Sequence, residues 1–351
     1  MSILRAAILS ALLLGLPMAG VWLAGLPADR YLEFPPGTLY VSHADFSWAA
    51  FAGLFLMELV VLILLFGAFV ARTRTASSSQ LRFPSWGYAG VALMAGTWVL
   101  AWSRFTWMEP FQAHTFTPLW ISYVLVVNAV TFWRTGRCLI THDTAYFLKL
   151  IPVSAGFWWF FEYLNRFVQN WTYQGTDQFS SLEYLLFATL SFSTVLPAVM
   201  STEELLASYG WRVSRDDEAV APGGSLLWNA AFGLCAVALL LIGVFPNALF
   251  PFLWLAPIGI FGRFMVPVSR VTRGQLYRLA FAALVCGFFW EMWNHFSHAK
   301  WIYHVPFVER FKIFEMPLLG YFGYLPFGVE CGIIAACLSR KEKSSHRRPE
   351  A

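Results

Sequence analysis

Apolar segments long enough to cross a membrane follow one another along almost the whole chain. A helix needs about 20 apolar residues to cross the hydrocarbon core of a bilayer, and about ten segments approach or reach that length. The polar stretches between them are too short to form a separate soluble domain. We therefore predict an all-α fold, a polytopic integral membrane helical bundle. The predicted spans are residues 5–27, 47–71, 85–102, 117–133, 147–169, 183–203, 224–245, 247–262, 276–299 and 314–338.

The amino-acid composition supports the same class. Of the 351 residues, 58% are hydrophobic and 13% are charged, and the mean hydropathy is +0.58. Soluble domains carry about 25% charged residues, so this composition indicates a protein of the lipid bilayer. We expect membrane lipids and no nucleic acid among its partners. The five cysteines include no Cys-x-x-Cys pair, which indicates neither a disulfide framework nor a zinc site. No glycine-rich nucleotide-binding pattern is present, and the cofactor and the oligomeric state stay open.

Basic residues gather in every second connecting segment. By the positive-inside rule, both termini therefore lie in the cytoplasm. The first span resembles a signal peptide, with Arg5 before the apolar stretch and small residues near Ala28. We interpret it as an uncleaved anchor, with cleavage of residues 1–27 as the alternative. The basic residues concerned are Arg72, Arg74, Arg82, Arg134, Arg137, Lys149, Arg263, Arg270, Arg273 and Arg278, followed by the C-terminal tail.

A pattern in residues 157–173 returns in residues 288–303. Each copy contains a glutamate, an asparagine three residues later, and a Trp-x-Tyr motif nine or ten residues after the glutamate. A Leu-Trp pair lies upstream of each copy, and downstream each has a glutamate at the start of the next predicted helix and a proline within it. The matched residues are Glu162 and Glu291, Asn165 and Asn294, Trp171 and Trp301, Tyr173 and Tyr303, Glu183 and Glu315, Pro197 and Pro326, with Leu119-Trp120 and Leu253-Trp254 upstream.

We infer two related three-helix units, residues 117–206 and 247–339. An N-terminal region of about three spans, residues 1–116, precedes them, a linking span at 207–246 separates them, and a basic tail at 340–351 follows. Four spans separate equivalent helices, so the two repeats should be parallel. A pseudo-two-fold axis along the membrane normal would then relate them.

The repeat places carboxyl groups within predicted helices. Glu162 lies about 15 residues into its span, about 22 Å along the helix axis, and Glu291 has a similar depth. Glu183 and Glu315 open the following helices from the outer surface. A charge near the bilayer centre costs about 2.5–3.5 kcal/mol, so such groups face the protein interior. We predict a site in the outer half of the bundle that uses at least two of the four carboxyls.

Asn165 and Asn294 follow the acids by one helical turn and lie on the same helix face. Each can donate a hydrogen bond to the ionised acid or orient the protonated one, which makes both asparagines candidates for the site. In the alternative interpretation these Glu–Asn pairs only join helices, through interhelical hydrogen bonds worth about 0.6 kcal/mol each.

The aromatic residues of the repeat are candidates for a substrate pocket. The Trp-x-Tyr motifs are either anchors at the membrane surface or walls of an apolar pocket that stabilise a cation over a ring face. The tryptophans that lie shortly before the two acids are further candidates for the pocket wall. The candidates are Trp158, Trp171, Tyr173, Trp290, Trp301 and Tyr303.

His295 and His298 share a helix face with Glu291 and are weak candidates for a metal site. The other copy has Arg166 and Gln169 in these places, so the ligand set is not repeated. We therefore favour a histidine cluster at the membrane surface and assign no metal.

The order of an acid, Trp-x-Tyr and an acidic helix start, repeated in two three-helix units, resembles the membrane lycopene cyclases of the bacterial heterodimeric and fused fungal type, with the related carotenoid hydratases. The match covers about residues 117–338. That family has a Pro-x-Glu-Glu motif where this chain has single acids. A competing alignment would use Pro326 with Glu330, or Pro197 with Glu203 and Glu204. The matching residues are Phe161-Glu162, Trp171-Thr172-Tyr173 and Leu182-Glu183-Tyr184-Leu185-Leu186-Phe187, then Trp290-Glu291, Trp301-Ile302-Tyr303 and Glu315-Met316-Pro317-Leu318-Leu319.

The resemblance implies a membrane-embedded enzyme that acts on an isoprenoid, a carotenoid or another lipid by acid–base chemistry, as a proton-initiated cyclase, hydratase or isomerase. The four acids Glu162, Glu183, Glu291 and Glu315 would protonate a polyene and steady the carbocation. The chain is also similar to a widespread group of bacterial membrane proteins without an assigned activity, which implies the bacterial cytoplasmic (inner) membrane.

Two other classes of function remain open. A transporter or flippase for lipids or small molecules would use the intramembrane acids for proton coupling and would need a water-accessible cavity. A structural subunit of a membrane complex would use the acids only to join helices. In that case glutamine at Glu162 and Glu291 would leave the complex active.

Overall fold

The computed structural model is mostly helical and describes residues 3–72, 81–209, 226–264 and 272–338. Five helical stretches in these ranges are long and apolar enough to cross a membrane, which fits a membrane protein. They do not amount to the ten spans predicted from sequence, because three further apolar helices are shorter and others are more polar. The five are Trp48–Leu65, Phe116–Thr135, Ser181–Ser208, Gly274–His295 and Leu318–Leu338; the shorter helices are Ala7–Leu23, Trp228–Leu241 and Phe252–Phe261.

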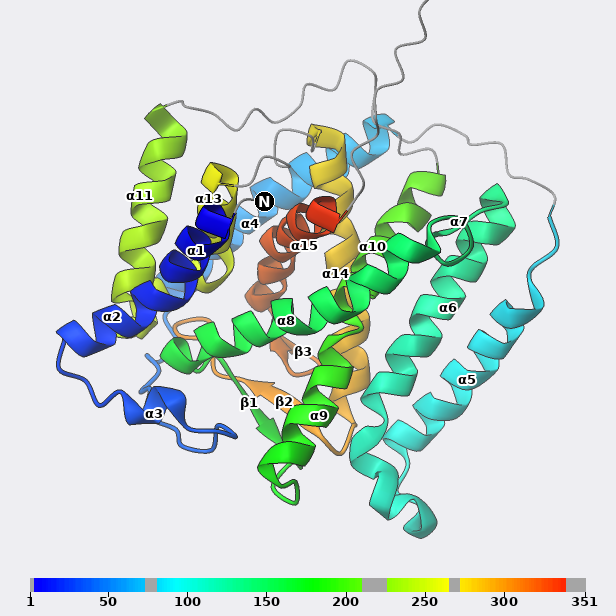
Figure 1. The fold of residues 1–351 in the computed structure, drawn as a ribbon, viewed down its shortest axis with the longest axis horizontal. Helices are drawn as coiled ribbons and strands as arrows, with labels where there is room; N and C mark the ends of the chain where they lie inside the picture. Colours follow the sequence, from blue (N-terminus) through cyan, green and yellow to red (C-terminus); the bar gives the residue numbers. More distant parts are fainter. Residues whose placement is uncertain (1–2, 73–80, 210–225, 265–271, 339–351) are drawn as a thin grey trace, which may run out of the picture.

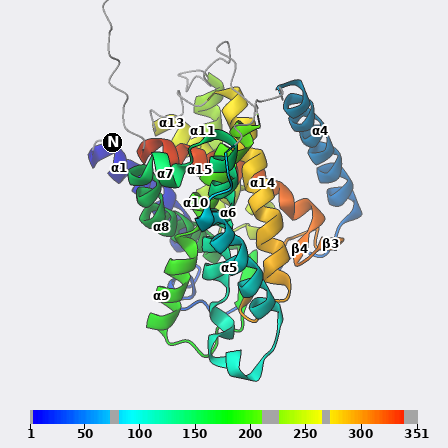
Figure 2. The ribbon, with the colours of Figure 1, turned by 90° about the vertical axis from the view of Figure 1, so that its right-hand side faces the viewer.

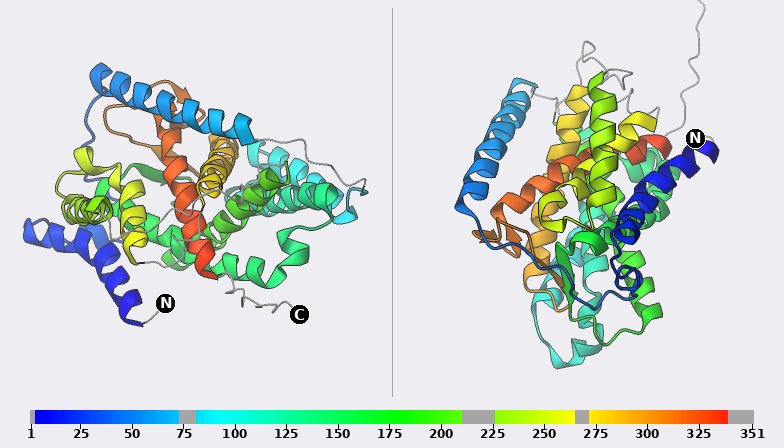
Figure 3. Two further views of the ribbon diagram at one scale, coloured as in Figure 1. Left: turned by 90° about the horizontal axis from the view of Figure 1, so that it is seen from above. Right: turned by 90° about the vertical axis from the view of Figure 1, so that its left-hand side faces the viewer.

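The N-terminal region wraps the outside of the bundle. Helix α4 lies at the edge, apart from most of the other helices, and contacts α14 and η4 (Figures 2 and 3). Few of its apolar side chains are buried inside the protein, which is expected of a helix that faces lipid. The elements of this region are α1 (Ile3–Ser10), the π-helix η1 (Ala11–Gly15), α2 (Leu16–Leu23), α3 (Asp29–Leu32) and α4 (Trp48–Arg72).

The first half of the bundle ends in a helix that packs against two others. Helix α10 contacts α6 and α8, and α5 packs along the outer side of α6. The elements are α5 (Ser85–Trp102), the 3-10 helix η2 (Thr106–His114), α6 (Phe116–Thr135), α7 (Leu139–His142), α8 (Thr144–Val168), β1 (Trp171–Gln174), α9 (Ser181–Phe192) and α10 (Val195–Ser208).

The second half shows the same order of contacts. Helix α15 contacts α13 and α14, and α11 packs against α13 as α5 does against α6. The segment predicted as a linking span, 207–246, contains α11, which packs against α13. The elements are α11 (Leu226–Leu241), α12 (Pro246–Leu249), α13 (Phe252–Phe264), α14 (Arg273–His295), β2 (Lys300–Tyr303), β3 (Lys312–Ile313), β4 (Met316–Pro317), η4 (Leu318–Gly323) and α15 (Tyr324–Leu338).

The two halves meet in the middle of the molecule (Figure 1). Helix α10 packs against α14, and α15 packs against α8, so the last helix of each half contacts the other half. Gly328 and Gly332 of α15 face α14, where a Cβ at Gly328 would lie 2.2 Å from the Leu279 carbonyl oxygen. Small residues four apart allow this close approach of two helix backbones.

The two halves also join through a short antiparallel strand pair, β1 and β2. Trp171 lies opposite Tyr303, and Tyr173 lies opposite Trp301. The two Trp-x-Tyr motifs therefore pair with each other, which departs from the prediction of helices alone. A strand displays alternate residues on one face, so the aromatic side chains of each motif point to the same side.

The predicted last span, 314–338, begins later than expected. Glu315 lies in the turn of a hairpin between β3 and β4 and not at a helix start. The η4 segment follows, and α15 begins only at Tyr324. Pro317 has no backbone N–H and takes an extended conformation, which accounts for the late start.

The stretch Ser181–Ser208 is broken at Ser193 and Thr194, between α9 and α10. The buried Ser154 hydroxyl of α8 donates to the Phe192 carbonyl at 2.6 Å and accepts from the Leu196 N–H at 2.9 Å. One side chain thus satisfies backbone groups on both sides of the break.

A segment at residues 38–44 lies across the end of the bundle that carries the strands. The side chain of Gln169 accepts from the N–H groups of Tyr40 and Val41, and its amide donates to the Thr38 carbonyl. The His43 ring stacks on His304, with ring centroids 5.7 Å apart. The segment therefore holds the ends of α8 and β2 together.

Candidate active site

The carboxyl group of Glu162 is surrounded by hydrogen-bond donors from its own half. Its Oε1 accepts from the indole nitrogens of Trp158 and Trp171, both at 3.0 Å, and from the Tyr173 hydroxyl at 2.5 Å. The residue is only 4% exposed. Three donors on one oxygen stabilise negative charge there and leave Oε2 with no hydrogen bond from the described residues.

Glu291 has a matching arrangement. Its Oε1 accepts from the hydroxyls of Tyr303 at 2.7 Å and Tyr324 at 2.6 Å. The indole of Trp301 donates to the Tyr303 hydroxyl at 2.8 Å and so extends the network. The residue is fully buried, and no described group hydrogen-bonds its Oε2. The two acids thus occupy corresponding places, and each helix begins 18 residues before its glutamate.

The asparagines hold the strands and do not bond the acids. Asn165 donates to the Trp171 carbonyl at 2.8 Å and accepts from its backbone N–H at 3.3 Å. Asn294 makes the same two bonds to Trp301, at 2.7 and 2.9 Å. The predicted hydrogen bond from each asparagine to its acid is therefore absent among the described residues, because the amide is used to turn the chain back.

Local structure explains how nearby residues come to surround each acid. Helix α8 ends at Gln169, whose φ of 47° lies in the left-handed region that ends helices. The chain then reverses, and the Asn165 side chain fixes the first strand residue beside Glu162. Trp158 approaches from one turn earlier on the same helix face.

The donors of both acids line a single cavity of about 150 Å³. More than half of the lining residues are aromatic, and they include all six residues predicted for a pocket: Trp158, Trp171, Tyr173, Trp290, Trp301 and Tyr303. Glu162 and Glu291 themselves do not line it and lie behind this wall. A bound molecule would therefore meet the phenol and indole groups first, with the carboxyls one hydrogen bond further away.

Each half covers the acid-bearing helix of the other. Trp120 of the first half lies 4.8 Å from Trp290, the residue before Glu291, between ring centroids. In the second half, Trp254 stacks 5.1 Å from Phe161, the residue before Glu162. The two predicted Leu-Trp pairs thus make equivalent contacts across the interface. Phe327 of α15 contacts rings from both sides, including Trp254.

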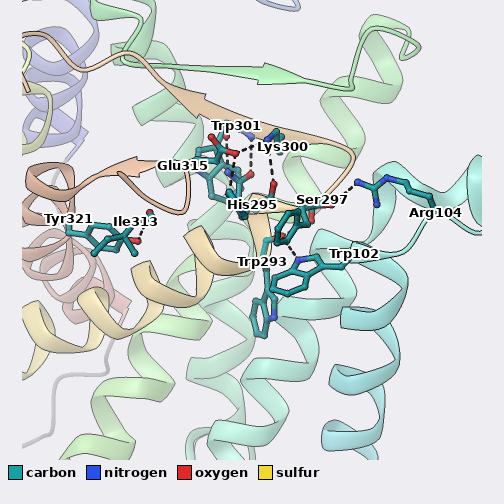
Figure 4. A network of polar contacts seen from close by, with 12 residues as sticks. Trp102, Arg104, Trp293, His295, Ser297, Lys300, Trp301, Ile313, Glu315 and Tyr321 are labelled. Atoms are coloured by element: carbon teal, nitrogen blue, oxygen red, sulfur yellow. Dashed lines mark hydrogen bonds and ion pairs between the residues drawn. The ribbon is translucent and has the colours of Figure 1, made fainter. Parts of the chain in front are cut away.

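The other two predicted acids do not join this cluster. Glu183 is exposed and caps its own helix, accepting from the N–H and hydroxyl of Ser180. These hydrogen bonds from Ser180 satisfy the Glu183 carboxylate locally, as in an ordinary capping box. Glu315 pairs with Lys300 at 2.7 Å and lies 3.3 Å from the His295 ring (Figure 4). Of the four candidate acids, Glu162 and Glu291 are therefore the two whose hydrogen-bond donors line the cavity.

The acids of the competing alignment lie elsewhere. Glu203 pairs with Arg278 at 2.8 Å and joins α10 to α14. Glu330 is fully buried on α15, and no described group bonds its carboxyl oxygens. Neither residue lines the cavity.

The histidines form no metal cluster in the described ranges. No group of three or more His, Cys, Asp and Glu side chains there is placed to hold an ion. His295 lies beside Glu315, and His304 stacks on His43 and hydrogen-bonds Thr172 at 3.1 Å.

Several wall residues were not predicted. Tyr324 donates to Glu291 from another helix, and Lys300, Tyr184 and Trp254 line the cavity. Trp254 was recognised only as part of a repeated Leu-Trp pair. Tyr324 has no counterpart at the matched position of the first half, so the repeat gave no signal for it.

The phenols on the strands are held as proton donors. Burial, and then the nearby Glu162 carboxyl, raise the pKa of Tyr173 well above its ordinary value. Burial and Glu291 do the same to the pKa of Tyr303. Both phenols therefore keep their protons at neutral pH and donate them in hydrogen bonds to the acids behind them.

Comparison of the chain with protein-family models, with curated proteins and with solved structures finds no match.

Proposed function

We propose that the protein is a membrane enzyme that binds the end of an isoprenoid or another apolar lipid in the aromatic cavity and exchanges protons with it. The observation that carries this proposal is the shared wall: every hydrogen-bond donor to Glu162 and Glu291 lines one cavity. An apolar cavity of this kind excludes water, so a neutral carboxyl behind it is an effective acid.

The proton moves in two linked steps. The Tyr173 hydroxyl, which donates to Glu162 in the structure, first turns toward the cavity. Protonated Glu162 then gives its proton to the Tyr173 oxygen while the Tyr173 proton passes to a double bond of the bound lipid. The new C–H bond leaves a carbocation, and the carboxylate is stabilised by its three donors. Tyr303 and Glu291 carry out the reverse steps. The cation releases a proton to the Tyr303 oxygen, and the Tyr303 proton passes to Glu291. The faces of Trp158 and Trp290 stabilise the cation in between.

The distant likeness to the lycopene cyclases and carotenoid hydratases agrees with this chemistry. It rests on short motifs, and in this chain the Glu183 and Glu315 positions do not supply acids to the cavity. We therefore assign the acid–base roles to Glu162 and Glu291 alone, and the role of proton carriers to Tyr173 and Tyr303.

We also infer that the two halves arose by duplication. The strand pairing, the Asn–Trp bonds and the reciprocal Trp contacts are matched pair by pair. The pairing of α5 with α6 and of α11 with α13 extends the repeat to four helices in each half. The ten spans, the parallel orientation, the cytoplasmic termini and the bacterial inner membrane remain predictions from sequence.

The test compares lipid extracts, by liquid chromatography and mass spectrometry, from a host deletion strain that carries each variant. The wild type and Glu183→Gln, a change at an exposed cap, should restore the missing product. Glu162→Gln and Glu291→Gln should leave its precursor to accumulate, at levels of purified protein equal to wild type.

Full product formation by the Glu162→Gln/Glu291→Gln double variant would overturn the proposed acid–base activity. A transporter would instead leave all lipids chemically unchanged and alter only their distribution between the leaflets. A structural subunit would remain active in its complex with both glutamines in place.

A further inference from the structure

The cavity has one charged side chain among its described lining residues, Lys300. The residue begins β2, directly before Trp301, at the end of the bundle where the strands lie. All the other lining residues are aromatic, aliphatic, hydroxyl-bearing or glycine. A single cation on an apolar wall is a group that can orient a ligand.

Several other polar hydrogens of the wall are used within the protein. The hydroxyls of Tyr173, Tyr303 and Tyr324 point at the two glutamates. Ser191 shares a hydrogen bond with Thr117 at 3.0 Å. Among the described lining residues, Lys300 is therefore the charged donor for a bound molecule, beside the neutral hydroxyls of Thr176 and Tyr184 and the indoles of Trp254 and Trp290.

The ammonium group has one strong internal acceptor. Its Nζ lies 2.7 Å from the Glu315 Oε1 and at a long 3.4 Å from the His295 carbonyl (Figure 4). An ammonium has three N–H groups, so it retains the capacity to donate to a ligand. Glu315 neutralises the charge, which favours an uncharged oxygen acceptor over an anion.

The size of the cavity limits what it encloses. About 150 Å³ is enough for one benzene-sized group. A long lipid can therefore place only its end inside, with the remainder of the chain outside the wall.

We propose that Lys300 donates a hydrogen bond to a neutral oxygen, a hydroxyl or a carbonyl, at the end of the isoprenoid lipid that enters the cavity. The apolar part of that end group packs on the tryptophans, and the oxygen fixes which atoms face Tyr173 and Tyr303. This inference rests on the proposed function, because it concerns the ligand of the same cavity.

Binding of geranylgeraniol tests the proposal, followed by tryptophan fluorescence of the purified full chain in nanodiscs. The corresponding hydrocarbon without oxygen and geranylgeranyl phosphate are the comparison ligands. The wild type should bind the alcohol about tenfold more tightly than the hydrocarbon, as one hydrogen bond to a charged donor predicts. It should bind the phosphate no more tightly than the alcohol.

Lys300→Met should reduce the preference for the alcohol to less than about twofold, and Lys300→Arg should retain it. The double variant Lys300→Met/Glu315→Gln removes both charges and should behave like Lys300→Met, which separates loss of the donor from an unpaired acid. Lys312→Met is the matched control, since Lys312 pairs with Glu309 at 2.9 Å outside the cavity. It should bind like the wild type.

Equal binding of alcohol and hydrocarbon by the wild type, or an unchanged preference in Lys300→Met, would overturn the role of Lys300 and leave the proposed function standing. Much tighter binding of the phosphate would also overturn it, in favour of an anionic head group. Failure of all three ligands to bind the wild type would count against the proposed function itself.

Discussion

Asn165 bonds both backbone groups of Trp171, with its side-chain nitrogen 2.8 Å from the carbonyl oxygen and its side-chain oxygen 3.3 Å from the backbone nitrogen. This pair converts the end of α8 into the start of β1. It also fixes the Trp171 indole against Glu162, at 3.0 Å. The asparagine therefore shapes the site without bonding the acid.

Asn165→Ala should lower the free energy of unfolding by about 2 kcal/mol, because two buried backbone groups lose their partner. The change should also weaken ligand binding, since Trp171 is no longer held. Denaturation in detergent, followed by tryptophan fluorescence, measures the first effect. Asn247→Ala removes the Ser42 and Ala44 bonds on a more exposed surface and should cost less. Equal stability of Asn165→Ala and wild type would contradict the argument.

Glu162→Leu should be far more destabilising than Glu162→Gln. Leucine leaves the Trp158, Trp171 and Tyr173 donors without an acceptor, at about 1–3 kcal/mol for each unpaired buried group. Glutamine keeps an oxygen for them but cannot give up a proton as a carboxyl does. The glutamine variant should therefore fold like the wild type and lose activity. A glutamine variant that retains full activity would show that the acid is only structural.

The sequence predicted the chemistry of the cavity wall better than its geometry. The repeated Trp-x-Tyr motifs gave four wall residues: Trp171 and Tyr173 donate to Glu162, Tyr303 donates to Glu291, and Trp301 donates to Tyr303. The pairing of the two motifs as strands was not predictable from either copy, since the strands form only when the two halves meet. A local pattern cannot report that contact.

At Glu183 the repeat suggested a functional role, whereas the local sequence pattern explains the side chain. A glutamate three residues after Ser180 is a capping-box pattern, and that local role accounts for the side chain entirely. The repeat suggested a functional counterpart for Glu315, but Glu315 is on a hairpin and pairs with a lysine. Matched positions in sequence therefore had different surroundings, because η4 replaces the first turns of a helix in the second half.

Gly328→Ala should separate α15 from α14. The added Cβ would lie 2.2 Å from the backbone oxygen of Leu279, so a helix must shift, at a cost of about 1–3 kcal/mol. Gly53→Ala on α4 is the control, since no atom lies within 4 Å of its Cβ. It should be neutral or stabilising by up to about 1 kcal/mol, because alanine favours helix. Thermal unfolding of both variants in the same detergent makes the comparison; a stable Gly328→Ala would mean that the helices are not this close.

Ser154→Ala should weaken the junction of α9 and α10. Its hydroxyl bonds the Phe192 carbonyl and the Leu196 N–H across the break, and both groups are buried. We expect a loss of about 1–3 kcal/mol of stability. Because Phe192 lines the cavity, ligand affinity should fall as well.

Ser122→Ala is the matched control for that change. Ser122 is equally buried, but its hydroxyl bonds only the Leu119 carbonyl of its own helix. That carbonyl belongs to the helical ladder, so the expected loss is below about 0.5 kcal/mol. Similar losses in the two serine variants would show that the break gains nothing from Ser154.

Acidification should destabilise the strand end of the bundle through His304. Burial of the ring lowers the pKa of His304 below its ordinary value, and His43 and Lys312 lower it further against the opposing effect of Glu309. An unfolded histidine titrates near pH 6.5. Between that pH and the lower native pKa the unfolded chain binds more protons, so stability falls as the pH falls through this window.

The measurement is the unfolding temperature in detergent from about pH 8 down to about pH 5.5. His304→Gln retains a partner for the Thr172 hydroxyl and should flatten the decrease. His142→Gln changes an exposed ring on α7 and should follow the wild-type curve. Since His43 stacks on His304, a charge on the His304 ring should weaken this contact, and the segment at residues 38–44 should be the first part to gain hydrogen exchange. If His304→Gln and the wild type lose stability in parallel, the titrating group lies elsewhere.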